Sequence, residues 1–423
     1  MGLSPRRRGA VAISALLIAL VACGDGSSGS PDRETEETVS DDNAADLVGG
    51  EDPASGEPVL IGQLTEGTSA TVEAGDEIPA GQAAADFINA HRGGIAGRPI
   101  ELVTCEMKVD PATAADCAHR MIEEGVVAVA MPQGAHTDAA WEPLHDAGIP
   151  FIVLSASGGG LLTDDESTFL MVNPAAAFFG LPIALAEAEG ADKVAFVLID
   201  VPQAHDVVDA DEGRTMAQAG LEFEVTAVPL GSPDMTPQMQ RVADSGAGVV
   251  HILGNDAFCI AAIQGLRSVG YDGAISGVSH CFSDATRTAL GADLEGISVL
   301  APLADGAVDD PTYQLYLAVM DEYGPDVSDV DSFYALSGYA AVATVAAALE
   351  TIDGEITPET VAETIRTMPE TELPAGGGVT FQCGGHAVPD QPAICTNQWL
   401  RGELDESGVP TSYTVEDASA LVE

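Results

Sequence analysis

The chain is short of positive charge. Its 423 residues include 15 lysines and arginines against 67 aspartates and glutamates, which gives a formal net charge of −52. Lys108 and Lys193 are its only lysines. A surface so rich in carboxylates repels nucleic-acid phosphates and anionic lipid headgroups. We therefore expect no nucleic-acid partner, and the acidic composition suits a salt-rich habitat.

The common enzyme motifs are also missing. There is no P-loop, and His136 and His145 are nine positions apart, which does not fit HExxH. The run Ser155–Gly159 lacks the first glycine of GxSxG. A GxGxxG does occur at Gly24–Gly29, but no strand precedes it. We therefore expect no enzyme activity.

Metal and cofactor signatures are absent as well. No CxxC pair, which a structural zinc site would favour, occurs in the sequence. A metal site formed by His205, Asp256 and His280 is conceivable, but isolated loop histidines are seldom ligands. We expect neither a metal nor a cofactor.

The N-terminus has the features of an export signal. Three arginines, Arg6 to Arg8, precede the apolar run Ala10–Ala22, which is too short for a comfortable membrane span. The run ends in Leu20-Val21-Ala22-Cys23, which resembles the lipobox of bacterial lipoproteins. That resemblance implies cleavage of residues 1–22 and lipid on Cys23; the alternative is an ordinary secretory signal.

A polar segment follows Cys23. Residues 24–57 are rich in Gly, Ser, Asp and Glu and nearly free of large apolar side chains. Such a composition buries too little surface to fold. We interpret 23–57 as the lipidated cysteine and a flexible acidic tether.

Six cysteines remain once Cys23 is set aside, and six allow fifteen pairings. An exported protein can form disulfides. Proximity in the sequence favours three local pairs: Cys105–Cys117, Cys259–Cys281 and Cys383–Cys395.

Short apolar runs alternate with helical segments along the rest of the chain. Strands are expected at Val59–Gly62, Ile100–Val103, Val126–Met131, Pro150–Leu154, Lys193–Ile199, Phe223–Val228, Val249–Leu253, Ala274–Gly277, Ile297–Leu300, Val379–Phe381 and Gln398–Leu400. Helices are expected at Pro79–Ala90, from Asp110-Pro111, through Trp141–His145, and at Gly213–Gly220, Met235–Asp244, Asp256–Gly270 and Tyr334–Leu349. This alternation predicts an α/β fold with parallel sheets covered by helices, and 366 residues after the tether (423 − 57) suggest two lobes.

Several phrases together resemble one family. Phe87–Ile100 (FINAHRGGIAGRPI), Asp110-Pro111 with its Ala-rich helix, Ala147–Ile152 and Gly265–Gly277 resemble elements of the branched-chain amino-acid-type substrate-binding proteins of ABC transporters. The resemblance spans most of residues 58–423. It implies the type I periplasmic-binding-protein fold, with two Rossmann-like lobes joined by three crossovers near 173, 302 and 382. The expected lobes are 58–173 plus 303–381, and 174–302 plus 382–423.

The resemblance also implies a binding site at the strand ends, where parallel sheets hold their ligands. In the first lobe it points to Gln133, Gly134 and Ala135 after one strand, and to Ser155, Ala156 and Ser157 after the next. In the second lobe it points to His205, Asn255, Asp256 and His280. We expect Ser155 and Ser157 to serve a carboxylate or amide oxygen and Asp256 an amine; the alternative for each is a solvated loop or helix cap.

The function implied is that of an extracytoplasmic solute receptor, lipid-anchored to the outer face of the cell membrane. Its expected partners are a small-molecule solute (an amino acid, an amide or a related compound) and the permease and ATPase subunits of an ABC transporter. We expect a monomer that touches the membrane only through its lipid. A receptor of the same fold that signals to a membrane sensor is the alternative.

Overall fold

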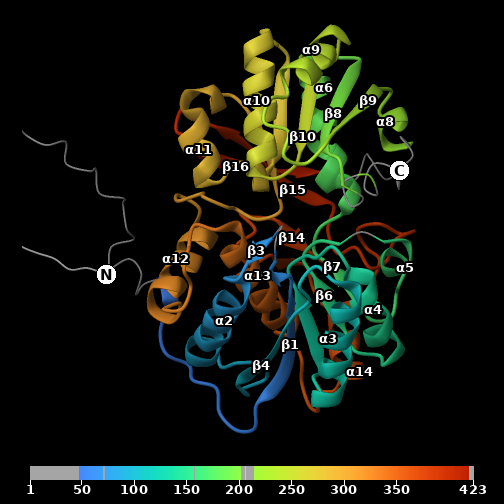
Figure 1. The fold of residues 1–423 in the computed structure, drawn as a ribbon. Helices are drawn as coiled ribbons and strands as arrows, with labels where there is room; N and C mark the ends of the chain where they lie inside the picture. The colour runs from blue at the N-terminus through green and yellow to red at the C-terminus, as the bar shows by residue number, and fades with distance from the viewer. Residues whose placement is uncertain (1–46, 70–71, 157, 202–204, 206–213, 419–423) are drawn as a thin grey trace, which may run out of the picture. The chain divides into compact units, whose positions relative to one another are not determined.

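Two sheets organise the chain in this computed structural model, which describes residues 47–69, 72–156, 158–201, 205 and 214–418 (Figure 1). The first sheet has the strand order β4-β1-β5-β6-β7 and is parallel throughout. The second has the order β16-β15-β12-β11-β10-β8-β9. It is parallel from β9 to β12, and its last two strands are antiparallel. The predicted α/β class is confirmed.

The first lobe contains the first sheet and the helices on its two faces. Its elements are β1 (Val59–Thr65), β2 (Gly67–Thr68), β3 (Glu73–Ala74), α2 (Glu77–His91), β4 (Ile100–Glu106), α3 (Pro111–Glu124), β5 (Ala128–Met131), α4 (Thr137–Asp146), β6 (Phe151–Val153), α5 (Gly159–Leu162) and β7 (Thr168–Leu170). Later segments add α12 (Pro311–Tyr323), α13 (Phe333–Ala348), α14 (Pro358–Thr367), β13 (Thr371–Glu372) and β14 (Thr380–Phe381).

The second lobe repeats the pattern. Its elements are η1 (Ala176–Gly180), α6 (Leu181–Glu189), β8 (Lys193–Ile199), α8 (Arg214–Gln218), β9 (Glu222–Val228), α9 (Thr236–Asp244), β10 (Val249–Leu253), α10 (Asp256–Val269), β11 (Ala274–Val278), η2 (Ser279–Cys281), α11 (Asp284–Leu290), η3 (Gly291–Leu294), β12 (Ser298–Ala301), β15 (Gln398–Leu404) and β16 (Pro410–Asp417).

Each sheet buries both of its faces, which is why its central strands are almost wholly apolar. In β1, Ile61 packs in one core with α2, α12 and α13, whereas Leu64 packs in another with α3. In β8, Val197 packs with α9 and α10, and Phe196 packs with α6. The alternation of side chains along a strand therefore directs neighbouring residues into different cores.

Local signals set the helix ends. Asp110 accepts a hydrogen bond from the backbone N–H of Thr113, and Pro111 occupies the first position of α3, as predicted. Gly125 ends the same helix in the left-handed conformation, which costs glycine little.

The chain passes between the lobes three times, after β7, after β12 and before β15. Asn173 in the first crossover donates from its side chain to that of Asn397 in the third, at 2.7 Å. Cys383 and Cys395 belong to the first-lobe core, and Cys395 donates its backbone N–H to Leu170. We therefore place the third crossover near Asn397, not near 382 as the sequence suggested.

The start of the folded body also differs from the expectation. Residues 47–57 were assigned to the tether, but they are hydrogen-bonded to the end of α2. Asp52 and Ala54 donate backbone N–H groups to Ala90 and Asn89, and Arg92 donates to the backbone oxygen of Val48. Backbone hydrogen bonds hold this segment although its composition is polar. The tether boundary therefore moves from residue 57 to about residue 47.

All three predicted disulfides are present, and each closes a local loop. Cys105–Cys117 joins β4 to α3, Cys259–Cys281 joins α10 to η2, and Cys383–Cys395 closes the loop before β15. The prediction from sequence proximity is confirmed. Cys23 lies outside the described residues.

Candidate functional site

The two first-lobe loops named from the sequence lie side by side. Leu154 and Ser155, which follow β6, donate backbone N–H groups to Met131, the last residue of β5, and to Pro132, each at 3.0 Å. The adjacent parallel strands bring both loops to the carboxyl edge of the sheet. This edge is where parallel α/β sheets bind ligands.

Most of the named first-lobe residues are placed by these loops. Gln133 and Gly134 are half-buried, Ala135 is exposed, Ser155 is half-buried and Ala156 is buried. Ser157 lies outside the described residues.

Glu66, which sequence reasoning did not single out, lies at the same edge. It directly follows β1 and is 5% exposed. Its carboxylate accepts the backbone N–H of Ala135 at 2.5 Å and that of Val109 at 3.0 Å. A Cβ on Gly134 would lie 2.6 Å from that carboxylate, so the close approach requires glycine. The carboxylate of Glu66 thus occupies one N–H donor that precedes α4 and one that precedes α3.

The loop that Glu66 holds has an unusual backbone. Lys108 and Val109 have φ of 57° and 54°, a region that β-branched residues rarely adopt. Lys108 donates its backbone N–H to the backbone oxygen of Glu66 at 2.9 Å. Strained backbone of this kind gathers at ligand sites and persists only where neighbouring contacts enforce it. Glu66 supplies two of those contacts.

Glu77, the first residue of α2, is a second buried carboxylate. Its side chain is fully buried, and neither carboxylate oxygen has a hydrogen-bond partner of good geometry among the described residues. Burial raises the pKa of Glu77 well above its ordinary value. The nearby backbone N–H of Glu66 lowers this pKa less than burial raises it, and the charge of Glu66 raises it further. At this position the fold favours the neutral acid.

Two further polar atoms are buried without a hydrogen-bond partner among the described residues. They are the Oε1 atom of Gln63 and the hydroxyl of Thr65, both on β1. Gln63 donates its amide to the backbone oxygen of Glu77 at 2.7 Å. The end of β1 therefore gathers several oxygen atoms that lack hydrogen-bond donors.

Tyr334, near the start of α13, faces the same group of acids. Burial, followed by the charges of Glu77, Asp256, Glu66 and Glu73, raises its pKa to about 12. Asp256 belongs to the second lobe, so acids of both lobes act on one hydroxyl. These four acids make the potential at the Tyr334 hydroxyl more negative.

The second-lobe residues named from the sequence have identifiable local roles. Asn255 caps α10 by accepting the backbone N–H of Phe258 at 3.2 Å. Asp256 is half-buried and accepts a hydrogen bond from the Ser283 hydroxyl at 2.7 Å. Cys259, three residues on, carries the disulfide to η2 beside this loop.

Of the two histidines in this set, the structure describes the side chain of His205 but not that of His280. His205 contacts Asp200 through Nε2 at 2.9 Å, and the two side chains are 36% and 52% exposed. His280 lies in η2, and its side chain is outside the described part of the structure. Neither histidine supports a metal site. Among the described residues, no group of three or more His, Cys, Asp or Glu side chains could hold a metal ion.

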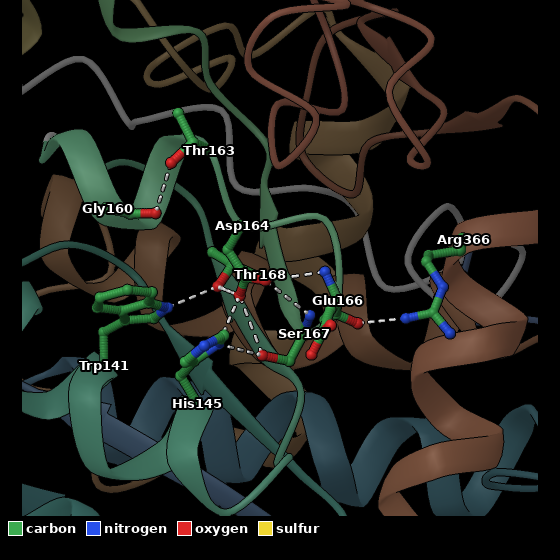
Figure 2. Close-up of polar contacts among 9 residues, drawn as sticks. All are labelled: Trp141, His145, Gly160, Thr163, Asp164, Glu166, Ser167, Thr168 and Arg366. Carbon is green, nitrogen blue, oxygen red and sulfur yellow. Dashed lines mark hydrogen bonds and ion pairs between the residues drawn. The ribbon is translucent and has the colours of Figure 1, made fainter.

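A separate polar cluster surrounds Asp164 (Figure 2). Its Oδ2 accepts hydroxyl hydrogen bonds from Ser167 at 3.0 Å and Thr168 at 2.5 Å. Trp141 donates its indole N–H to Thr168 and stacks on His145. Burial raises the pKa of Asp164, but these hydroxyls, the backbone N–H of Glu166 and the charge of His145 outweigh it, so the pKa is lowered.

This cluster contains a serine, a histidine and an aspartate, but not in catalytic geometry. The Nδ1 atom of His145 faces both Asp164 Oδ2 at 3.2 Å and Ser167 Oγ at 3.3 Å. A catalytic triad needs the base to contact its orienting acid through one ring nitrogen and the nucleophile through the other. Ser167 is also 4% exposed. The cluster therefore ties α4 to β7.

A cavity of about 440 Å³ lies beside this cluster. It is lined by Asp165, Thr168, Phe169, Arg366, Gly384, Gly385, Pro389 and Pro392. Thr168 is the first residue of β7, so the cavity lies at the amino end of that strand. Ligands of parallel sheets bind at the opposite edge, so we do not assign the ligand site to it.

Comparison with known proteins decides the family. The family model described as periplasmic binding protein matches residues 58–394. This chain belongs to the periplasmic binding protein family. A curated relative, the leucine-, isoleucine-, valine-, threonine- and alanine-binding protein of Pseudomonas aeruginosa, is 24% identical over 65% of this chain and 73% of its own length.

Solved structures show the same fold at low identity. The branched-chain amino acid transporter substrate-binding protein of Streptococcus pneumoniae, in complex with isoleucine, has a TM-score of 0.63 and 20% identity over 85% of this chain and 100% of its own. A solute-binding protein of R. palustris, in complex with 4-hydroxybenzoate, has a TM-score of 0.65 and 19% identity over 85% and 96%. The predicted type I fold is confirmed.

Membership of the periplasmic binding protein family settles the broad class. The protein is an extracytoplasmic ligand carrier and not an enzyme. Within the described residues, no helix has both the length and the apolar character of a membrane span.

Glu66 and Glu77 are the residues that sequence reasoning missed in this binding protein. In the sequence, Glu66 lies in an ordinary polar loop. Glu77 lies in the first turn of a helix, where glutamate is common because it suits the helix dipole. The available signal was indirect. Gly81 and Gly338 interrupt helices α2 and α13, and glycine within a helix often marks a close approach.

Proposed function

We propose that this periplasmic binding protein captures a small polar solute between its two lobes and delivers it to the permease of an ABC transporter. The observation that carries the proposal is the pair of parallel sheets, joined by three crossovers, with polar residues of both lobes acting on Tyr334. A ligand that touches both lobes binds the closed state better and shifts the population toward it.

The proposed contacts are the strand-end loops of both lobes. They comprise Gln133, Gly134, Ala135, Ser155, Ala156, Ser157, His205, Asn255, Asp256 and His280, to which we add Glu66, Glu77 and Tyr334. The relatives differ in what they bind: one is named for leucine, isoleucine, valine, threonine and alanine, and another was solved with 4-hydroxybenzoate. The fold therefore supports a solute-binding role without fixing the solute.

Binding and closure are tested together on the full-length protein in mild detergent. A thermal-shift screen of amino acids, amides, aromatic acids and amines should return compounds that raise the melting temperature, since a ligand at a hundred times its Kd stabilises by about 2.7 kcal/mol. Calorimetry then gives the Kd, and small-angle scattering with and without the compound reports compaction. Tight binding without compaction would contradict closure. A screen in which nothing binds would contradict the function.

Delivery is tested by reconstitution with the permease and ATPase subunits in vesicles. The loaded protein should stimulate ATP hydrolysis and uptake of the same solute. Stimulation of a membrane kinase in place of uptake would favour a sensing receptor.

The proposed anchor is the lipid on Cys23. A Cys23→Ala variant should lose its partitioning into the detergent phase, because two or three acyl chains are what hold a lipoprotein firmly. A Cys259→Ala, Cys281→Ala double variant is the control for loss of cysteine as such. Unchanged partitioning of Cys23→Ala would contradict the anchor.

A further inference from the structure

The first-lobe edge of the proposed site is poor in hydrogen-bond donors. The backbone N–H groups of Ala135 and Val109 would suit an anion, since free N–H groups near a helix start attract negative charge. Both already donate to the carboxylate of Glu66, at 2.5 and 3.0 Å. An anionic ligand group arriving there meets a buried carboxylate instead of open donors.

The same edge has acceptors that no donor satisfies. Both oxygens of the Glu77 carboxylate, the Oε1 atom of Gln63 and the hydroxyl oxygen of Thr65 are buried and have no partner among the described residues. Buried polar atoms nearly always have a partner, and each exception requires a physical reason. Glu77 lies against Glu66, whose backbone N–H and charge both act on it. Together these acceptor atoms would be satisfied by a positively charged group that donates several hydrogen bonds.

Acidic side chains of both lobes add negative charge to this acceptor-rich edge. The charges of Glu66, Glu73, Glu77 and Asp256 all reach the Tyr334 hydroxyl. An aromatic ring with acids around it also suits an organic cation, which is attracted to the face of the ring.

Building on the proposed function, we propose that the solute is an organic cation whose ammonium, amidinium or guanidinium group is received between Glu66, Glu77 and Tyr334. Glu66 is then the residue that sets selectivity, because it blocks the N–H donors that a carboxylate would need and adds a negative charge in their place. Glu77 supplies the second acceptor from α2, and a cation bound beside it offsets the burial that favours its neutral form in the free protein.

Matched pairs of probes test the sign of the ligand charge. Pentylamine and pentanoate each have five carbons, benzylamine and benzoate share a phenyl ring, and 1,5-diaminopentane and glutarate each have a five-carbon skeleton. Calorimetry and thermal shift on the full-length protein should show the amine of at least one pair binding ten or more times more tightly than its carboxylate. Pentanamide and benzamide give the neutral reference for each head group.

Variants separate selectivity from a purely structural role. Glu66→Ala frees the N–H donors of Ala135 and Val109, so amines should lose at least tenfold in affinity while carboxylates gain. Glu77→Gln, which keeps the shape of the side chain, should weaken amines at least tenfold and leave the neutral amides within about twofold. Glu101→Gln, an exposed charge on β4, removes the same charge elsewhere and should change neither.

The outcomes are distinguishable. If carboxylates bind more tightly than amines in every pair, the cationic-ligand proposal is overturned and the solute-binding function stands. If both glutamate variants lose all probes equally, Glu66 and Glu77 are structural and the proposal is likewise overturned. If no probe of either charge binds and the wider screen is also negative, the binding function itself fails.

Discussion

Lowering the pH should destabilise this protein through one buried histidine. His251 lies on β10 with its side chain fully buried. Its Nδ1 contacts the Ser276 hydroxyl at 2.9 Å, and its Nε2 has no partner among the described residues. Burial lowers the pKa of His251 from 6.5 to about 3, so the native state holds it neutral. The unfolded state binds its proton below about pH 6.5.

The size of the effect follows from that gap. Stability from this residue is fully present above pH 6.5 and is lost as the pH falls toward 3, because only the unfolded state gains the proton there. Each pH unit in that window costs about 1.4 kcal/mol. Between pH 7.5 and pH 4.5 the loss is therefore about 3 kcal/mol, on the order of a quarter of the stability of a typical domain.

Urea unfolding of the wild type and a His251→Asn variant, at both pH values and constant salt, measures this loss. Asparagine keeps a polar atom near Ser276 but does not titrate, so the variant loses only what the carboxylates contribute. The wild type should lose about 3 kcal/mol more than the variant over the interval. Equal losses in the two proteins would refute the reasoning, since the histidine would then not be held neutral by the fold.

Three other changes test further parts of the structure. Glu77→Gln should gain stability relative to the wild type as the pH rises above 4.5, because burial raises the pKa of Glu77 and its ionisation costs native stability there; parallel pH profiles of the two melting temperatures would contradict this. Cys259→Ser with Cys281→Ser should lose about 3 kcal/mol by the loop-entropy model for a separation of 22 residues, and wild-type urea stability in that variant would contradict it. Asp164→Ala should lose about 2 to 4 kcal/mol, because it leaves the buried hydroxyls of Ser167 and Thr168 without their acceptor; a smaller loss than in an exposed Asp165→Ala control would count against the cluster.

The sequence predicted the regular elements well where the apolar pattern was strong. The expected bounds of β8 and β10 agree with the structure, and the cap and proline that begin α3 lie where they were expected. Such signals are local, so a single sequence carries them. The short strand β7 and the final strand β16 were missed. β7 has only three residues, and β16 (PTSYTVED) is polar because it forms the edge of its sheet.

The site was predictable only in part, because its chemistry depends on contacts between distant residues. The loops after β5 and β6 could be named from their position behind buried strands. The contact of Glu66 with Ala135 spans 69 positions, and no local pattern encodes it. The N-terminal segment around Asp52 was read as tether because its composition is polar, yet backbone hydrogen bonds, which do not depend on side-chain type, hold it to α2.

The close packing of α2 against α13 limits how this protein can be redesigned. A Cβ on Gly338 would overlap the backbone of Glu77, and one on Gly81 would overlap the side chain of Gln63. A larger residue at Gly338 would push α13 away from α2, and one at Gly81 would push α2 away from the Gln63 side chain on β1. A library built to change ligand preference should therefore keep both glycines fixed and vary Glu73 and Glu77 first, because the carboxylate of Glu66 also holds the backbone of Val109 and Ala135.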